Sequence, residues 1–149
     1  MAIRLYNYRE ATDGLFTAMT ERVAERTAPV YLGKKTIAIV DDDEALLEAT
    51  SGFLEAMGYD VLAFGSGEAF LESPDMERVD VLLTDINMPG MSGLDLQNVV
   101  RAQHPRIPVV MMTALRDDML RQRAITSGAR ELLQKPILAD DLIRCLEGA

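Results

Sequence analysis

The chain has 149 residues, a length typical of one domain with its own packed core. Its formal net charge at pH 7 is -9, and residues 36–149 hold twenty Asp/Glu against nine Lys/Arg, so direct binding to nucleic acid or to an anionic membrane surface is not expected. Cys145 is the only cysteine, which excludes an internal disulfide and fits a reducing, cytoplasmic compartment. The first residues lack the apolar stretch of a signal peptide, and no apolar run approaches the length of a membrane span.

Residues 1–35 precede the regular pattern of the body and are interpreted as an N-terminal extension. Four apolar residues in it share one helical stripe: Leu15, Phe16, Met19 and Val23. The stripe predicts a helix over about 13–27 that docks on the body or on a partner. A loosely ordered extension is the other interpretation, and the sequence leaves both open.

The body, residues 36–149, alternates strand-like and helix-like segments. The strand-like runs are Ile37–Val40, Val61–Phe64, Val79–Leu83, Ile107–Met112 and Glu131–Leu133. The segments with helical spacing are Glu44–Met57, Ser66–Leu71, Ser92–Gln103, one that Asp117 or Asp118 opens and Gly128 ends, and Ala139–Glu147. In the third of these helices, the apolar stripe predicted to be buried is Leu94, Leu96, Val99 and Val100.

Strand followed by helix, five times over, predicts an α/β fold with a parallel sheet covered on both faces. Right-handed crossovers leave few topologies, and the flavodoxin-like (βα)5 doubly wound sheet with strand order 2-1-3-4-5 is the leading choice. In this order strands 1 and 3 are neighbours at the switch point, so a ligand site is expected beyond their C-terminal ends.

Polar residues gather at those strand ends. The first strand runs into Asp41, Asp42 and Asp43, and the third, in the stretch VLLTDINMPGMSG, runs into Asp85 before a Pro-Gly turn. The fourth strand ends in Thr113 and the fifth in Lys135, the only lysine after residue 35. The predicted topology brings these groups to one edge of the sheet.

Such a cluster of acids needs a cation, because carboxylates about 4 Å apart repel by roughly 4 kcal/mol at an effective dielectric of 20. Oxygen-only ligands favour a hard ion such as Mg²⁺. Each group also has a plainer interpretation: Asp43 as a helix N-cap, Asp85 as a turn former, Thr113 as an ordinary strand residue and Lys135 as a solvated charge. Together, however, they indicate an acid that accepts a phosphoryl group. In that interpretation Asp85 is the nucleophile, while the metal and Lys135 neutralise charge and Thr113 holds an oxygen.

Four stretches, IAIVDDDE, LLTDINMPGMSGLDL, VVMMTAL and SGARELLQKP, resemble the receiver domain of bacterial two-component response regulators, over about residues 36–147. The resemblance implies a regulatory domain that catalyses only its own phosphorylation and dephosphorylation. Its phosphodonor would be a phosphohistidine on a sensor histidine kinase or a phosphotransfer protein, and its downstream target stays open.

The resemblance also implies roles for single residues. Asp85 would be the phosphorylation site and would bind Mg²⁺ with Asp42 through their side chains, with Asp41 acting through water and Asn87 through its backbone carbonyl. Thr113 and Lys135 would contact the phosphoryl group, and the Lys135–Pro136 bond would be cis.

Two positions depart from the family pattern. Leu132 stands where the family usually carries Tyr or Phe, and Ile137 stands where Phe is frequent. The expected switch region, Thr113 and Leu132, therefore lacks the aromatic partner, and the signal is expected to pass through the Thr113 loop and the helix over 117–127. The chain ends just after its fifth predicted helix, so it is either a single-domain regulator that acts through protein contacts or a fragment without its output domain. A homodimer is a further open expectation.

Two other functions compete with this one. The run Asp41-Asp42-Asp43 contains the Asp-x-Asp of haloacid-dehalogenase-type phosphatases, with Asp41 as nucleophile, although Ala45 stands where that family has Thr or Val. A receiver-like binding module that never takes phosphate is the second alternative. The aspartate that carries phosphate, if any does, distinguishes the three.

Overall fold

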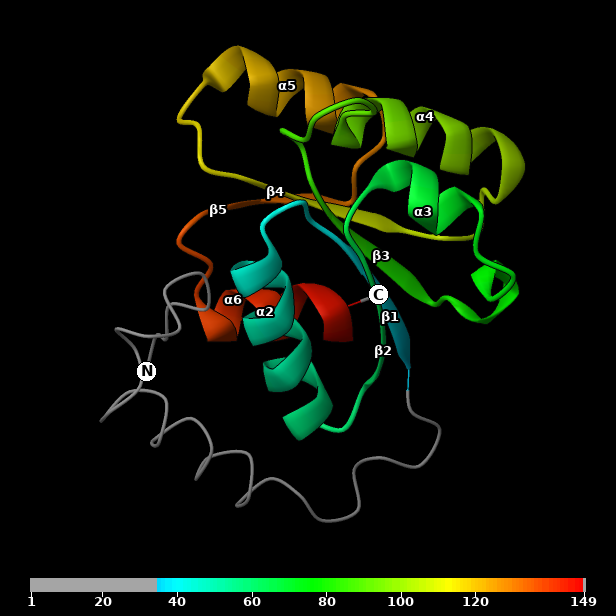
Figure 1. Ribbon diagram of the computed structural model, residues 1–149. Helices are drawn as coiled ribbons and strands as arrows, with labels where there is room; N and C mark the ends of the chain where they lie inside the picture. Colours follow the sequence, from blue (N-terminus) through cyan, green and yellow to red (C-terminus); the bar gives the residue numbers. More distant parts are fainter. Residues whose placement is uncertain (1–34, 149) are drawn as a thin grey trace.

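Five parallel strands form one sheet in the order β2-β1-β3-β4-β5 (Figure 1). In chain order the strands are β1 Thr36–Val40, β2 Asp60–Phe64, β3 Val81–Asp85, β4 Val109–Thr113 and β5 Glu131–Gln134. The computed structural model describes residues 35–148. The predicted helix over 13–27 lies outside them. The α/β class, the flavodoxin-like topology and the strand order predicted from the sequence are confirmed.

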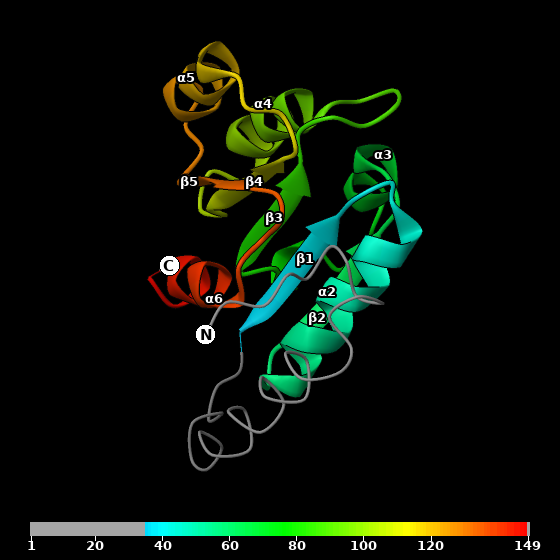
Figure 2. The same ribbon diagram turned by 90° about the vertical axis from the view of Figure 1, so that its left-hand side faces the viewer.

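Helices cover both faces of this sheet, as Figures 1 and 2 show from two directions. The helices are α2 Glu44–Ala56, α3 Gly67–Leu71, α4 Gly93–Gln103, α5 Asp118–Thr126 and α6 Ala139–Glu147, with a short 3-10 helix, η2, at Met76–Arg78. One apolar core lies between the sheet and α2 and α6, and a second lies between the sheet and α3, α4 and α5. None of the helices within residues 35–148 is long and apolar enough to cross a membrane.

Strand β1 contributes to both cores because its side chains alternate across the sheet. Ile37 and Ile39 pack in the core under α2 and α6, whereas Ala38 and Val40 pack in the core under α3, α4 and α5. All four are fully buried, and burying a side chain of the Val or Ile type contributes about 1.5–3 kcal/mol. Strand β1 is thereby fixed in register by packing on both faces of the sheet.

Polar caps begin most of the helices where the sequence placed them. The side chains of Asp43, Ser66, Ser92 and Asp117 each accept a main-chain N–H of the first turn of the following helix. The Ser92 cap is a full capping box, because Asp95 bonds back to the Ser92 N–H. Asp117, rather than Asp118, is the cap of α5.

Two predicted strands begin two residues too early. Val79 closes η2 by donating to the Met76 carbonyl, and Asp80 instead pairs with Thr36, so β3 starts at Val81 and reaches Asp85. The N–H of Ile107 closes a turn onto the His104 carbonyl, so β4 starts only at Val109.

The buried face of α4 also differs from the predicted stripe. Leu96 and Val100 are buried as expected, but Leu94 and Val99 are only half-buried, and Gln97 is fully buried. Gln97 lies inside because its amide donates to Ser127 at the end of α5, at 2.6 Å to the carbonyl and 3.0 Å to the hydroxyl. A polar residue thus joins two helices where an apolar stripe was expected.

Candidate functional site

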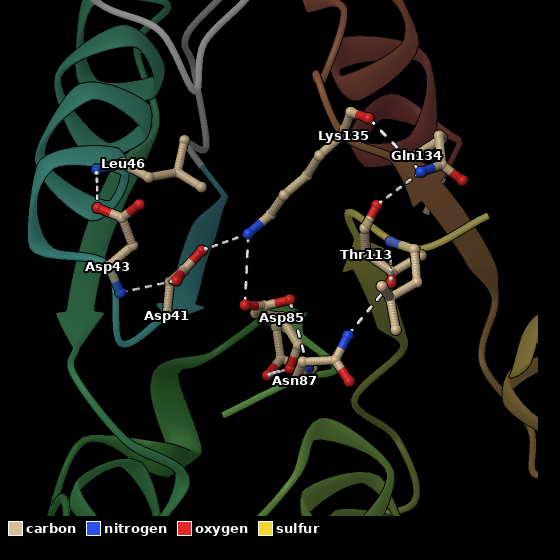
Figure 3. Close-up of polar contacts among 10 residues, drawn as sticks. Asp41, Asp43, Leu46, Asp85, Asn87, Thr113, Gln134 and Lys135 are labelled. Carbon is tan, nitrogen blue, oxygen red and sulfur yellow. Dashed lines mark hydrogen bonds and ion pairs between the residues drawn. The ribbon is translucent and has the colours of Figure 1, made fainter. Parts of the chain in front are cut away.

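The C-terminal ends of four strands meet at one edge of the sheet and carry the polar residues that the sequence predicted (Figure 3). Asp41 directly follows β1, Asp85 ends β3, Thr113 ends β4 and Lys135 directly follows β5. Parallel pairing places these ends side by side, because register partners such as Asp85 and Met112 lie at the same level. The spatial convergence expected from the topology is therefore present.

Three of the carboxylates form a compact group. One oxygen each from Asp41, Asp42 and Asp85 lies within 4.8 Å of the others. Asp41 and Asp85 are only 1% and 6% exposed, whereas Asp42 faces solvent. Asp43 is excluded from this group because its side chain caps α2 through the Leu46 N–H, at 3.1 Å.

Lys135 joins the two buried acids. Its Nζ lies 3.2 Å from Asp41 Oδ2 and 3.3 Å from Asp85 Oδ2, and its side chain is 12% exposed. Figure 3 shows the Lys135 side chain reaching from the end of β5 to both carboxylates. The ammonium is thus a positive charge shared between two acids.

Burial raises the pKa of Asp85, and the neighbouring charge of Asp41 raises it further, although Lys135 opposes both effects. Burial also raises the pKa of Asp41, against a main-chain hydrogen bond from Asp43 and the charge of Lys135. The two carboxylates therefore carry their charge at a cost, because a buried anion loses its hydration. A cation beside them lowers that cost.

Thr113 lies on the β4 side of the site with its hydroxyl oxygen already accepting hydrogen bonds. Leu115 N–H donates to Thr113 Oγ1 at 3.1 Å, and Asn87 Nδ2 lies 3.4 Å from the same atom. The hydroxyl proton is then left to donate toward another acceptor. Asn87 also directs its main-chain N–H to Asp85 Oδ1 at 3.4 Å, so its side chain and its main chain contact two different members of the site.

The donor set fits a hard divalent cation. It consists of carboxylate oxygens only, on three acids close enough to share one ion, and two of the three acids are buried. Mg²⁺ prefers oxygen ligands and often binds through one or two carboxylates while keeping several waters. The exposed Asp42 leaves this group open to solvent on one side, as such hydration requires.

The two positions where the sequence departs from the expected pattern are buried. Leu132 is 6% exposed on β5, opposite Met111 of β4, and Ile137 is 2% exposed. The Lys135–Pro136 bond is cis, as expected from the sequence.

Two contacts at the site were missed by sequence reasoning. One is the side chain of Asn87. The other is Gln134, whose amide nitrogen lies 3.2 Å from the Thr113 carbonyl oxygen. A polar residue beside Lys135 carries no recognisable signal, because solvated strand ends are commonly polar.

Comparisons with known proteins agree with this geometry. The family model of the response regulator receiver domain matches residues 37–147. The response regulator protein TmoT of Ectopseudomonas mendocina is 34% identical over 131 residues, covering 83% of this chain and 60% of TmoT. The response regulator protein TodT of Pseudomonas putida is 33% identical over 113 residues, covering 76% of this chain and 50% of TodT.

Comparison with solved structures also finds receiver domains. A CheY-like response regulator receiver domain protein from Methanospirillum hungatei JF-1 has a TM-score of 0.72 and 28% identity, over 78% of this chain and 93% of its own. The chain therefore spans nearly the whole of this receiver domain, but only 60% and 50% of the lengths of TmoT and TodT.

Proposed function

Because this chain belongs to the response regulator receiver domain family, we propose that it accepts a phosphoryl group on Asp85 from a phosphohistidine of a sensor histidine kinase or phosphotransfer protein, in a Mg²⁺-dependent reaction. The observation that supports this best is the Lys135 ammonium within 3.3 Å of the Asp85 carboxylate and 3.2 Å of the Asp41 carboxylate. Three separate strand ends supply these groups, and a structural ion pair alone would not require the third acid, Asp42, beside them.

The reaction transfers phosphorus between two side chains. The N–P bond of the donor imidazole breaks, a P–O bond forms to an Asp85 carboxylate oxygen, and the freed imidazole nitrogen takes a proton from solvent. Asp85 must be charged to attack. The Lys135 ammonium favours the charged form, because it opposes the increase in pKa that burial causes.

Each neighbouring residue has a separate task. Asp41, Asp42 and Asp85 would hold Mg²⁺ with the Asn87 backbone carbonyl, and the ion, when bound, would neutralise charge on the transferring group. Lys135 would neutralise a further oxygen. The Thr113 hydroxyl would donate its free proton to an oxygen of the bound phosphoryl group.

Acetyl phosphate, a small phosphodonor, tests this proposal without a partner protein. Wild-type protein with Mg²⁺ and acetyl phosphate is expected to gain one phosphoryl group by intact mass, and Asp85→Asn is expected to gain none. Chelation of Mg²⁺ should abolish the gain in wild type. Asp43→Asn is the matched control, because Asp43 caps α2 and lies outside the carboxylate group.

Each outcome separates the competing functions. Phosphate mapped to Asp41 instead of Asp85 would favour a haloacid-dehalogenase-type reaction. Wild type that stays unmodified, while a known receiver domain is modified in parallel, would favour a binding module that takes no phosphate.

The phosphorylated state is proposed to be signalled through the Thr113 loop and α5. The three large apolar side chains that are exposed within residues 35–148 all lie there: Leu115 at 51%, Met119 at 76% and Ile125 at 47%. The Thr113 hydroxyl is bonded to the Leu115 N–H, so a turn of Thr113 toward a phosphoryl group displaces the start of this loop.

This signal can be followed by NMR. On phosphorylation, the backbone chemical shifts of residues 115–126 are expected to change more than those of α2, and the change should be absent in Asp85→Asn. Unchanged shifts in α5, with phosphorylation verified by mass, would contradict this route.

A further inference from the structure

A ring of contacts surrounds the proposed phosphoryl site, and Gln134 closes it (Figure 3). The Asp85 carboxylate meets the Lys135 ammonium at 3.3 Å and the Asn87 main-chain N–H at 3.4 Å. The Asn87 side chain continues the ring to the Thr113 hydroxyl, at 3.4 Å. The Gln134 side-chain amide spans the remaining gap, because it donates to the main-chain carbonyls of Thr113 at 3.2 Å and of Lys135 at 3.5 Å.

This bridge lies where the ladder between β4 and β5 stops. Thr113 and Gln134 are the last register pair, and the final main-chain bond runs from the Lys135 N–H to the Thr113 carbonyl at 2.7 Å. The amides that follow do not extend the ladder, since Leu115 N–H turns back to the Thr113 hydroxyl and Pro136 has no N–H. The Gln134 amide donates to the same Thr113 carbonyl as this last ladder bond, so it adds a second connection between the two strand ends where the ladder stops.

We propose that Gln134 is a positioning residue of the phosphoryl site, which sets the separation of the Thr113 hydroxyl from the Lys135 ammonium. This inference rests on the proposed function. Gln134 acts through the main chain of the two residues that would contact the phosphoryl group, and its amide is bonded to none of the three acids. It should therefore influence phosphoryl transfer and leave Mg²⁺ binding unchanged, because the three acids lie at the C-terminal ends of β1 and β3.

The surroundings of Gln134 make it suitable for substitution. The side chain is only half-buried and lines a surface pocket with Leu115, Leu132 and the first residues of α5. A side chain of equal length fills the same space and creates no closed cavity. Gln134→Met removes both donated hydrogen bonds at similar volume, and Gln134→Glu keeps the shape but turns a carboxylate toward two carbonyl oxygens.

The test separates transfer from metal binding. With acetyl phosphate and saturating Mg²⁺, Gln134→Met is expected to be phosphorylated about fivefold more slowly, the factor that one neutral hydrogen bond contributes, and Gln134→Glu more slowly still. The Mg²⁺ dissociation constant, from an NMR titration, should match that of wild type. Hydrogen exchange of the Lys135 amide should accelerate, because the adjacent hydrogen bond from Gln134 to the Thr113 carbonyl is lost. Hydrogen exchange of the β1 amides should stay unchanged.

Two further variants make the result specific. Gln97→Met removes another amide that donates to a main-chain carbonyl, at the end of α5, and should leave the rate unchanged. In a Thr113→Ala background, Gln134→Met should lower the phosphorylation rate by a smaller factor, because the Thr113 hydroxyl that Gln134 positions has been removed. An equal decrease in phosphorylation rate in the Gln97 and Gln134 variants would instead show a general structural role and overturn the proposal. A decrease in Mg²⁺ affinity together with the decrease in rate would do the same.

The outcomes distinguish this inference from the function on which it rests. Wild type that takes up phosphate at the same rate as Gln134→Met, with equal exchange at Lys135, overturns the role of Gln134 and leaves the proposed function standing. Wild type that takes up no phosphate overturns both.

Discussion

Lys135 has to balance more negative charge than it carries. Its ammonium lies between Asp41 and Asp85, and the exposed Asp42 adds a third carboxylate nearby. In a poorly hydrated site, removing one member of such a group changes stability by more than a surface ion pair would. The raised pKa of Asp85 shows that burial and the charge of Asp41 together outweigh the attraction of Lys135.

Stability at neutral pH should therefore increase when the Asp85 charge is removed. A carboxyl group whose pKa is raised above 3.8 on folding favours the folded state below 3.8, and that contribution is lost as the pH rises through the raised value. Without metal, Asp85→Asn is expected to melt roughly 2–4 °C higher than wild type at pH 7, the shift that about 1 kcal/mol produces in a protein of this size.

The pH dependence is the check on that explanation. Thermal unfolding with a chelator present should show a smaller gain for Asp85→Asn at pH 4 than at pH 7, because part of the wild-type carboxyl is already neutral at pH 4. An equal gain at both values would mean that packing, not charge, is responsible.

At the scale of elements, the junction between β3 and α4 holds Asp85 in place. Gly93 begins α4, and its N–H donates to the Ile86 carbonyl at 2.8 Å. A Cβ on Gly93 would collide with the Asp85 carbonyl oxygen and lie 2.8 Å from the Ile86 Cα. Both are main-chain atoms of the strand end that carries the acid, so neither can move aside without moving Asp85.

Gly93→Ala is accordingly expected to lower the free energy of unfolding by about 1–3 kcal/mol, the usual cost of overpacking. It should also slow phosphorylation by acetyl phosphate. Gly52→Ala is the matched control: Gly52 lies in the middle of α2 with open space around its missing side chain, and alanine there should stabilise by about 0.5–1 kcal/mol. Urea unfolding measures both, and a neutral Gly93→Ala would contradict the close approach described here.

The sequence predicted some parts of the fold and of the site better than others. The site acids, Thr113 and Lys135 could be located from the sequence because parallel topology forces polar strand ends together. The starts of β3 and β4 could not be predicted from the sequence. Asp80 pairs with Thr36 and Ile107 closes a turn, and these hydrogen bonds depend on how the chain folds around them. Gln134 was missed for the same reason: its role depends on which carbonyls lie within reach of its amide.

For the whole molecule, residues 35–148 contain both cores and every residue of the proposed site. Lys35 belongs with them because its Nζ donates to the Leu146 carbonyl at 2.9 Å. We propose that this part is the receiver domain and that residues 1–34 are an extension to it.

A chain trimmed to residues 35–149 is therefore expected to melt at the same temperature as the full chain and to take up phosphate from acetyl phosphate at the same rate. Calorimetry and intact mass measure the two. A trimmed chain that melts lower and reacts more slowly would show that the preceding residues form part of the domain.

The alternation along β1 has a consequence for how this chain tolerates insertions. Odd and even positions of the strand serve opposite cores, and the next residue is Asp41. One amino acid inserted within β1 would swap the faces of the positions before it or carry Asp41 beyond the reach of Lys135. The length of β1 therefore sets both the packing of the two cores and the position of the acid that contacts Lys135.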